Sequence, residues 1–156
     1  MPASREDAAH PAKSAGPGPL TLVGAVAVGG GTGSVARFAV EDNWTAGPHD
    51  FPWATTVTNI VGCTVMGVLM VVLKERWRNA PAVVNPMLGT GFLGGFTTFS
   101  SYTDDVRRLI DNDEIGYAMA RLFLTIVGAL VGVWLGTVIG RVLLLGPAAV
   151  RGGRVP

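Results

Sequence analysis

Four long apolar stretches dominate the pattern of hydrophobic and polar positions along the chain. They cover Leu20–Val40, Phe51–Leu73, Val83–Tyr102 and Ile115–Leu145. Each reaches the roughly 20 apolar residues that a helix needs to cross a bilayer, although the fourth is much longer and glycine and hydroxyl residues weaken the third. The polar connections between them are short and cover residues 41–50, 74–82 and 103–114. The pattern predicts four membrane-spanning helices and leaves no segment for a soluble domain.

The composition of the chain favours an all-α integral membrane protein. Of its 156 residues, 49% are hydrophobic and only 15% are charged, and the mean hydropathy is +0.42, which is too apolar for a typical soluble domain. Residues 1–19 are rich in proline, alanine and charge, and predict a disordered tail. Residues 20–146 form the predicted membrane domain, and 147–156 a C-terminal tail. The first apolar stretch exceeds the length of a signal-peptide core, so we expect a permanent span.

The charged residues exclude several classes of function. All eleven acidic residues fall outside the interiors of the predicted spans, whereas a proton-coupled exporter needs a carboxylate within the membrane. The net charge of +1 comes without a basic cluster interleaved with aromatic residues, which argues against a nucleic-acid partner. Neither His10 nor His49 pairs with a plausible nucleophile, so we expect no enzymatic activity.

Lysine and arginine residues are distributed unequally between the two sides of the predicted bundle. Eight lie on the side that carries both termini, namely Arg5, Lys13, Lys74, Arg76, Arg78, Arg141, Arg151 and Arg154. The other side has Arg107 and Arg108, or four residues when Arg37 and Arg121 near the span ends are included. Because cytoplasmic loops carry the excess of positive charge, both termini are predicted to lie in the cytoplasm, with the chain in the inner (plasma) membrane.

The third apolar stretch contains the most unusual segment of the chain, Gly91–Tyr102. Gly-Gly and Thr-Thr pairs at membrane depth are tolerated only where protein or a water-filled cavity surrounds the backbone. We therefore expect a broken helix, whose freed carbonyls can coordinate a cation and whose freed amides can face an anion. Phe96, Phe99 and Tyr102 recur every three residues and are expected to share one helix face. That face either packs in a core or offers electropositive ring edges to an anion.

Two polar residues in the other stretches have more than one interpretation. Asn59 lies mid-span, with Thr55 and Cys63 one turn away on the same face, and it either binds two helices together or contributes to an ion pathway. Arg37 lies near the end of the first stretch. It either snorkels to the interface, attracts anions to a vestibule or donates to carbonyls of the broken helix. In the absence of membrane carboxylates, these donors favour a small, strongly hydrated anion.

Glycines recur at every fourth position of the fourth stretch, at Gly128, Gly132, Gly136 and Gly140. This spacing gives a helix face without side chains, which allows another helix to approach closely. The partner is either a helix of the same chain or a helix of a second subunit.

Three motifs resemble the signature motifs of the CrcB/Fluc family of fluoride channels, in family order and spacing. They are GGGTGSVARF at 29–38, TVTNIVG at 56–62 and GFLGGFTTFS at 91–100. The resemblance extends over about residues 20–145. It implies a four-helix subunit, an antiparallel dimer with two fluoride pores, and one structural sodium ion (Na+) at the dimer centre, bound by backbone carbonyls of the broken third helix.

The resemblance also implies roles for individual residues. The backbone carbonyls of Gly94 and Thr97 match the positions that hold sodium, and Asn59 matches the pore asparagine. Arg37 matches the arginine that follows the first motif. The remaining pore positions are Phe99, the hydroxyl pair Ser100 and Ser101, and the polar residues Tyr117 and Thr125 of the fourth helix.

Three features depart from the family pattern. Tyr102 replaces its second phenylalanine and adds a hydroxyl to a ring whose edge would face the ion, so one of the two pores would conduct poorly. Arg121 stands where a neutral polar residue is expected, and it would trap an anion or contact a carbonyl of the partner. The charge bias disfavours insertion in both orientations.

We therefore expect passive export of fluoride, and protection from its toxicity, by an antiparallel heterodimer with an oppositely biased homologue. The alternatives are a homodimer, a non-conducting partner subunit and a small multidrug-type exporter.

Overall fold

The structure of the chain, a computed structural model, consists of helices and their connections throughout the residues that it describes, which are 16–44, 51 and 53–146. The long helices are α1 (Pro19–Asn43), α2 (Trp53–Val71) and α5 (Ile115–Leu145). The shorter ones are η1 (Val72–Arg76), η2 (Pro86–Leu93), α3 (Gly94–Phe96) and α4 (Ser100–Asp111). These helices confirm the predicted all-α class. Most of the two predicted tails, residues 1–15 and 147–156, lies outside the described residues.

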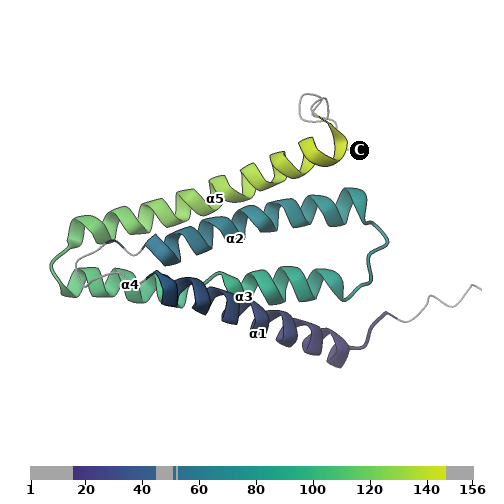
Figure 1. Cartoon of the computed structure of the whole chain (residues 1–156), viewed down its shortest axis with the longest axis horizontal. Coiled ribbons are helices and arrows are strands. Elements are labelled where there is room, and N and C mark those ends of the chain that lie inside the picture. The colour runs from purple at the N-terminus through teal and green to yellow at the C-terminus, as the bar shows by residue number, and fades with distance from the viewer. Residues whose placement is uncertain (1–15, 45–50, 52, 147–156) are drawn as a thin grey trace, which may run out of the picture.

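The chain runs back and forth along the long axis of the molecule (Figure 1). The beginning of α1 and the end of α5 lie at the same end, together with the turn that joins η1 to η2, and α4 lies at the opposite end. Lys74, Arg76, Arg78 and Arg141 therefore share an end of the bundle, as the charge count assumed. The other four residues of the larger set lie outside the described residues, and the orientation in the membrane stays a prediction.

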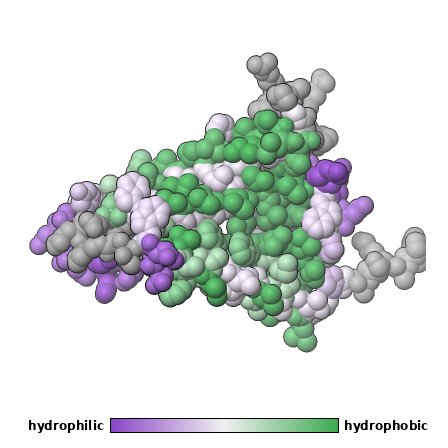
Figure 2. Space-filling model, in the orientation of Figure 1, coloured by the Kyte–Doolittle hydropathy of each residue, from purple (hydrophilic) through white to green (hydrophobic). Residues whose placement is uncertain are grey.

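Among the residues that the structure describes, three helices are long and apolar enough to cross a membrane. They are Pro19–Asn43, Trp53–Arg76, which combines α2 and η1, and Ile115–Leu144. Most of their residues are not buried inside the chain, and Figure 2 shows apolar side chains across the middle of the molecule with polar ones toward its ends. Soluble monomers rarely expose apolar patches of this extent. The chain is therefore a membrane protein.

The third apolar stretch is divided between three helical segments. η2 and α3 follow one another without a gap, residues 97–99 are not helical, and α4 begins at Ser100. η2 is a π-helical segment, in which the Gly94 amide donates to the Gly89 carbonyl five residues earlier. None of the three segments is long enough to span a bilayer alone, so a fourth crossing stays a prediction.

The helix α4 occupies most of residues 103–114, for which the apolar pattern predicted only a polar connection. It continues to Asp111, and only residues 112–114 join it to α5. Tyr102 and Leu109 are both buried and lie two turns apart, so α4 is amphipathic. A scan for uniformly apolar stretches misses such a helix, because charged residues occupy its other face. Asp113, with a positive φ of 59°, makes the turn into α5.

The glycines of the fourth stretch face α2 of the same chain. A Cβ atom added at Gly136 would overlap the Thr64 carbonyl oxygen and would lie 3.1 Å from the Cα of Gly67. Of the two partners left open by the sequence, the structure therefore shows a helix of the same chain. This contact, the glycine seam, consists of Gly128, Gly132, Gly136 and Gly140 on α5 and of Ile60, Thr64, Gly67 and Val71 on α2.

Candidate ion-binding groove

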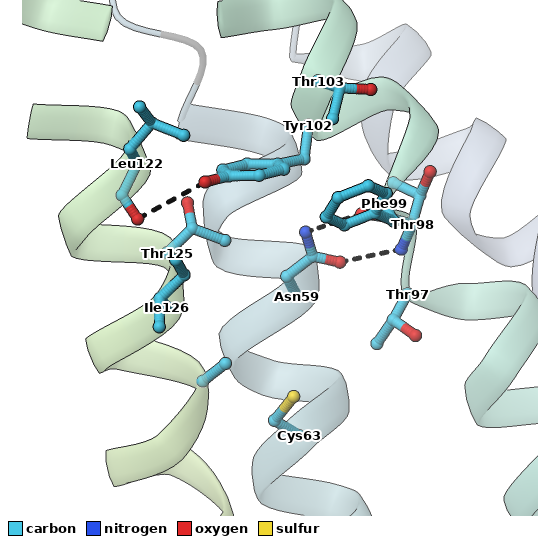
Figure 3. Close-up of a pocket in the computed structure, with 11 residues that line it drawn as sticks. Asn59, Cys63, Thr97, Thr98, Phe99, Tyr102, Thr103, Leu122, Thr125 and Ile126 are labelled. Atoms are coloured by element: carbon cyan, nitrogen blue, oxygen red, sulfur yellow. Dashed lines mark hydrogen bonds between the residues drawn. The ribbon is translucent and has the colours of Figure 1, made fainter. Parts of the chain in front are cut away.

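A cavity of about 520 Å³ lies between α2, the interruption at residues 97–99, α4 and α5. Figure 3 shows how side chains from these segments converge on it. This cavity, the Asn59 groove, brings together four of the predicted pore residues, and no carboxylate belongs to its lining in the described part of the chain. Its polar lining residues are Asn59, Thr97, Thr98, Tyr102, Thr103 and Thr125.

The carboxamide of Asn59 binds α2 to the backbone of the interruption. Its Nδ2 donates to the Thr98 carbonyl at 3.0 Å, and the Thr98 amide donates to its Oδ1 at 2.8 Å (Figure 3). These two bonds satisfy a non-helical peptide that would otherwise lack partners in apolar surroundings. Asn59 therefore connects two helices, which is one of its two interpretations. Its second Nδ2 hydrogen has no further contact among the described residues and remains a donor for the groove.

Gly94 and Thr97 are among the residues whose carbonyls lose their helical partners at the interruption. In a continuous helix the Gly94 carbonyl would accept from the Thr98 amide, which donates to Asn59 instead. The Thr97 carbonyl would accept from the Ser101 amide, which donates to Thr98 Oγ1 at 3.1 Å. Hard cations prefer oxygen ligands, so these two carbonyls fit the sodium site that the resemblance implies. A Cβ at Gly94 would also meet nothing within 4 Å, which leaves room beside it.

The aromatic residues of the third stretch lie on the two sides of the interruption. Phe96 stacks on Phe92 with ring centroids 6.2 Å apart, whereas Phe99 and Tyr102 line the groove, 5.7 Å apart. The expectation of one shared face is wrong for Phe96, because the helix breaks before Phe99. Phe99 is 76% exposed and Tyr102 only 5%. The Tyr102 hydroxyl donates to the Leu122 carbonyl at 3.4 Å, so the unusual hydroxyl points to α5.

The hydroxyl pair Ser100 and Ser101 is not part of the described groove lining. Thr98 Oγ1 lies 3.2 Å from Ser100 Oγ and donates to Ser101 Oγ at 3.2 Å. Both serines therefore stabilise the turn that follows the interruption. Thr98, to which the sequence gave no role of its own, is the residue at the centre of this arrangement. Its backbone contacts Asn59 and its hydroxyl contacts both serines.

Arg37 connects α1 to the residues around the interruption. Its Nε donates to the Gly95 carbonyl at 3.3 Å, and its Nη1 donates to Ser101 Oγ at 3.4 Å and pairs with Glu41 at 3.2 Å. Of the three interpretations of Arg37, these contacts correspond to donation to a carbonyl of the third stretch. The carboxylate of Glu41 also compensates its charge, which weakens its attraction for an anion.

Tyr117 and Thr125 occupy different environments although both belong to α5. Thr125 is buried in the groove wall, and its Oγ1 has no hydrogen-bond partner among the described residues. Tyr117 is half exposed, and its ring meets that of Phe51 edge to face at 6.5 Å, away from the described lining. Thr125 is therefore the one of the two that offers a donor to an ion in the groove.

Arg121 is completely buried between α5, α4 and α2. Its Nη2 donates to Asp105 Oδ2 at 2.6 Å, and its Nη1 donates to Thr56 Oγ1. The guanidinium carbon lies 5.7 Å from the centre of the Tyr102 ring. The sequence suggested a trapped anion or a carbonyl of the partner as the contact of Arg121, whereas the structure gives it a carboxylate of its own chain.

Comparison with known proteins identifies the family. Residues 24–137 match the family described as CrcB-like protein, Camphor Resistance (CrcB). The chain belongs to the CrcB family. A CrcB relative from Streptomyces coelicolor, named fluoride-specific ion channel FluC 1, is 45% identical over 82% of this chain and 82% of its own length. Fluoride-specific ion channel FluC 2 of Streptomyces avermitilis is 43% identical over 80% and 74%, and FluC of Pseudomonas fluorescens (strain Pf0-1) is 40% identical over 75% and 94%.

The CrcB match covers the whole Asn59 groove. It extends from α1 into α5 and includes every residue of the described lining, as well as the Arg121–Asp105 pair. The resemblance seen in the three sequence motifs is thereby confirmed at the level of the family.

Proposed function

We propose that this chain is a subunit of a fluoride-selective channel, through which fluoride leaves the cell passively. The observation that carries the proposal is its membership of the CrcB family, in which relatives at 36–45% identity are named fluoride-specific ion channels. Fluoride enters cells as neutral HF and ionises at cytoplasmic pH, so a pore without energy coupling is sufficient to remove it. Such export would protect the cell from fluoride toxicity.

The chemistry of the Asn59 groove supports an anion as its ligand. Dehydrating a small anion costs on the order of tens of kcal/mol, so donors must replace water along the path. The groove offers the second Nδ2 hydrogen of Asn59 and the hydroxyl of Thr125, and its described lining has no carboxylate. The rings of Phe99 and Tyr102 add electropositive edges. Selection over chloride would follow from pore width and donor density.

A second, antiparallel subunit would complete the pathway. Phe99 is 76% exposed in the single chain, and Gly94 has open space where a side chain would lie. Both features are expected at a surface that another subunit covers. The carbonyls of Gly94 and Thr97 would bind a structural sodium ion there, since both have lost their helical partners. The bias in lysine and arginine favours a homologous subunit of opposite bias over a second copy.

The orientation follows from the same charges. The basic residues of the turn after α2 and of the end of α5 lie at the end of the bundle where α1 begins. By the positive-inside rule this end faces the cytoplasm, with the chain in the plasma membrane.

Fluoride efflux from liposomes, followed with a fluoride electrode, tests the function. We expect fluoride but not chloride to leave liposomes that contain this chain together with its homologous partner. Asn59→Asp should abolish efflux, because a carboxylate repels the anion and cannot donate to the Thr98 carbonyl. Asn79→Asp, at an exposed position outside the groove, is the matched control. No fluoride efflux from the wild type with or without the partner would refute the proposal.

A non-conducting partner subunit is the second candidate, favoured by the Tyr102 hydroxyl and by the charge of Arg121 beside the groove. If the chain is such a subunit, fluoride efflux would occur only upon co-expression with the homologous partner and would survive Asn59→Asp in this chain. Robust efflux from the chain alone would instead show that it forms a working homodimer.

The Gly94→Ala variant tests subunit association and sodium binding. The added methyl group meets nothing within 4 Å in the single chain, so the variant should fold. It should lose both association with the partner and the stabilisation by sodium chloride relative to N-methylglucamine chloride, measured by size exclusion and thermal unfolding. Gly31→Ala, with equally open surroundings on α1, is the control. An identical sodium response in the two variants would contradict the site.

A further inference from the structure

A positive charge lies beside the wall of the Asn59 groove. Arg121 directly precedes Leu122 and stands four residues before Thr125, and both of these line the groove. Its guanidinium carbon is 5.7 Å from the centre of the Tyr102 ring, which forms part of the wall. Because the side chain is fully buried, water screens its charge only weakly.

An uncompensated guanidinium in this place would bind the anion that the groove conducts. Arginine binds small anions through charge-assisted hydrogen bonds, which are stronger than those between neutral groups. A channel conducts only when an ion leaves its sites as readily as it enters them. A chain with an arginine beside its ion path therefore needs a compensating negative charge.

Asp105 supplies this charge from α4. Its Oδ2 lies 2.6 Å from Nη2 of Arg121, and its Oδ1 lies 3.9 Å from Nη2 of Arg108, so the carboxylate faces two cations. Only 18% of its side chain is exposed. Its neighbour Asp104 differs in each respect, because it pairs with Arg107 at 3.8 Å and both side chains are 76% exposed. The two adjacent aspartates thus have separate roles.

We propose that Asp105 is a built-in counter-ion, which occupies Arg121 and prevents it from trapping the permeating anion. The inference rests on the proposed conduction of fluoride. Asp105 acts here through Arg121 and does not touch the ion, so it is a positioning residue. Its carboxylate sets how tightly the path binds fluoride.

Fluoride efflux measured over a series of fluoride concentrations tests the counter-ion, with the homologous partner present where the wild type needs it. Asp105→Asn leaves the Arg121 charge uncompensated, so the half-saturating concentration should fall by about tenfold and the maximal rate should fall with it. Arg121→Gln leaves the carboxylate beside the path, so the half-saturating concentration should rise. The double variant should return to the wild-type value. Asp104→Asn, the matched control, should behave as the wild type.

The opposite shifts of the half-saturating fluoride concentration in Asp105→Asn and Arg121→Gln distinguish a counter-ion from a purely structural ion pair. A structural pair would lower the unfolding temperature of both single variants without moving the half-saturating concentration in opposite directions, and that result would overturn the proposal. If Asp105→Asn does not fold, Arg121→Gln and Asp105→Glu complete the test. Asp105→Glu keeps the charge and should retain the wild-type concentration dependence, and a tenfold fall in this variant would contradict the role.

A binding measurement separates this inference from the proposed function. Thermal unfolding in detergent is compared in sodium fluoride and in sodium gluconate, which reports anion binding without conduction. Fluoride should stabilise Asp105→Asn by more than it stabilises the wild type. Equal stabilisation of the two proteins would overturn the counter-ion, whereas a wild type that conducts no fluoride would overturn the proposed function.

Discussion

The helix α2 contacts its neighbours in two very different ways. At the glycine seam it meets α5 backbone to backbone, with Gly136 against Thr64 and Gly67. At the interruption the side chain of Asn59 on α2 hydrogen-bonds to both the backbone amide and the backbone carbonyl of Thr98. In the seam both helices keep their backbone hydrogen bonds. At the interruption the side chain of one helix replaces bonds that the other has lost.

The two contacts therefore have different roles: the glycine seam stabilises the helix pair, and the interruption supplies groups that can bind ions. A close helix contact in a membrane gains stability from van der Waals packing and leaves no polar group to bind a ligand. An interrupted helix leaves carbonyls without their usual partners. Such carbonyls bind ions because the hydrocarbon region contains no other hydrogen-bond donor for them. Damage to the seam should therefore reduce stability, whereas damage to the interruption should also change the response to ions.

The largest effect is expected at the seam. In Gly136→Ala the new methyl group would overlap the Thr64 carbonyl oxygen, and α5 must move away from α2 to accommodate it. We expect a loss of about 3 kcal/mol in the free energy of unfolding, measured by thermal or denaturant unfolding in detergent micelles. Gly31→Ala, where a methyl group meets nothing within 4 Å, should leave the stability unchanged. Equal unfolding temperatures for the two variants would show that the helices do not touch at Gly136.

A smaller effect, but a different one, is expected at the interruption. Asn59→Ala removes both bonds to the Thr98 backbone and should cost about 2 kcal/mol of unfolding free energy. The Thr98 amide then becomes a partner for the Gly94 carbonyl, so stabilisation by sodium should also disappear. Unfolding in sodium chloride and in N-methylglucamine chloride measures both changes. Asn43→Ala, which removes an exposed side chain at the end of α1, should retain the sodium response, and its loss there would contradict this explanation.

The smallest effect is expected at the groove wall. Tyr102→Phe removes only the long hydrogen bond to the Leu122 carbonyl and should cost less than about 1 kcal/mol, measured by thermal unfolding. Fluoride efflux should rise, because the ring is no longer fixed to α5 by its hydroxyl. Tyr117→Phe makes the same chemical change outside the described groove lining and should alter neither quantity. A fall in efflux for Tyr102→Phe would instead assign the hydroxyl a direct role in conduction.

Sequence patterns predicted the parts of the fold that apolar length determines. The three long helices follow from continuous apolar stretches, and the weakness of the third stretch follows from its glycines and threonines. The helix α4 was missed because burial of only Tyr102 and Leu109 determines its helical face, and charged residues surround both. The partner of the glycines on α5 was left open, since such a spacing fits any close helix neighbour.

The sequence likewise predicted some residues of the candidate site and not others. Asn59 and Thr125 were identified because a polar side chain is conspicuous in an apolar stretch, and both line the groove. The role of Thr98 was not predicted, because its contribution lies largely in its backbone, which all residues share. Asp105 was missed because its proximity to Arg121 depends on α4 being a helix.

The pairing of Asn59 with Thr98 also has a consequence for the order in which the protein is synthesised. Translation proceeds from the N-terminus, and Asn59 leaves the ribosome 39 residues before Thr98. The side chain that satisfies the exposed peptide is therefore made before that peptide, and Asp105 is likewise made 16 residues before Arg121. In both cases the second group is made when its partner in the chain is already present, so it does not depend on a later helix.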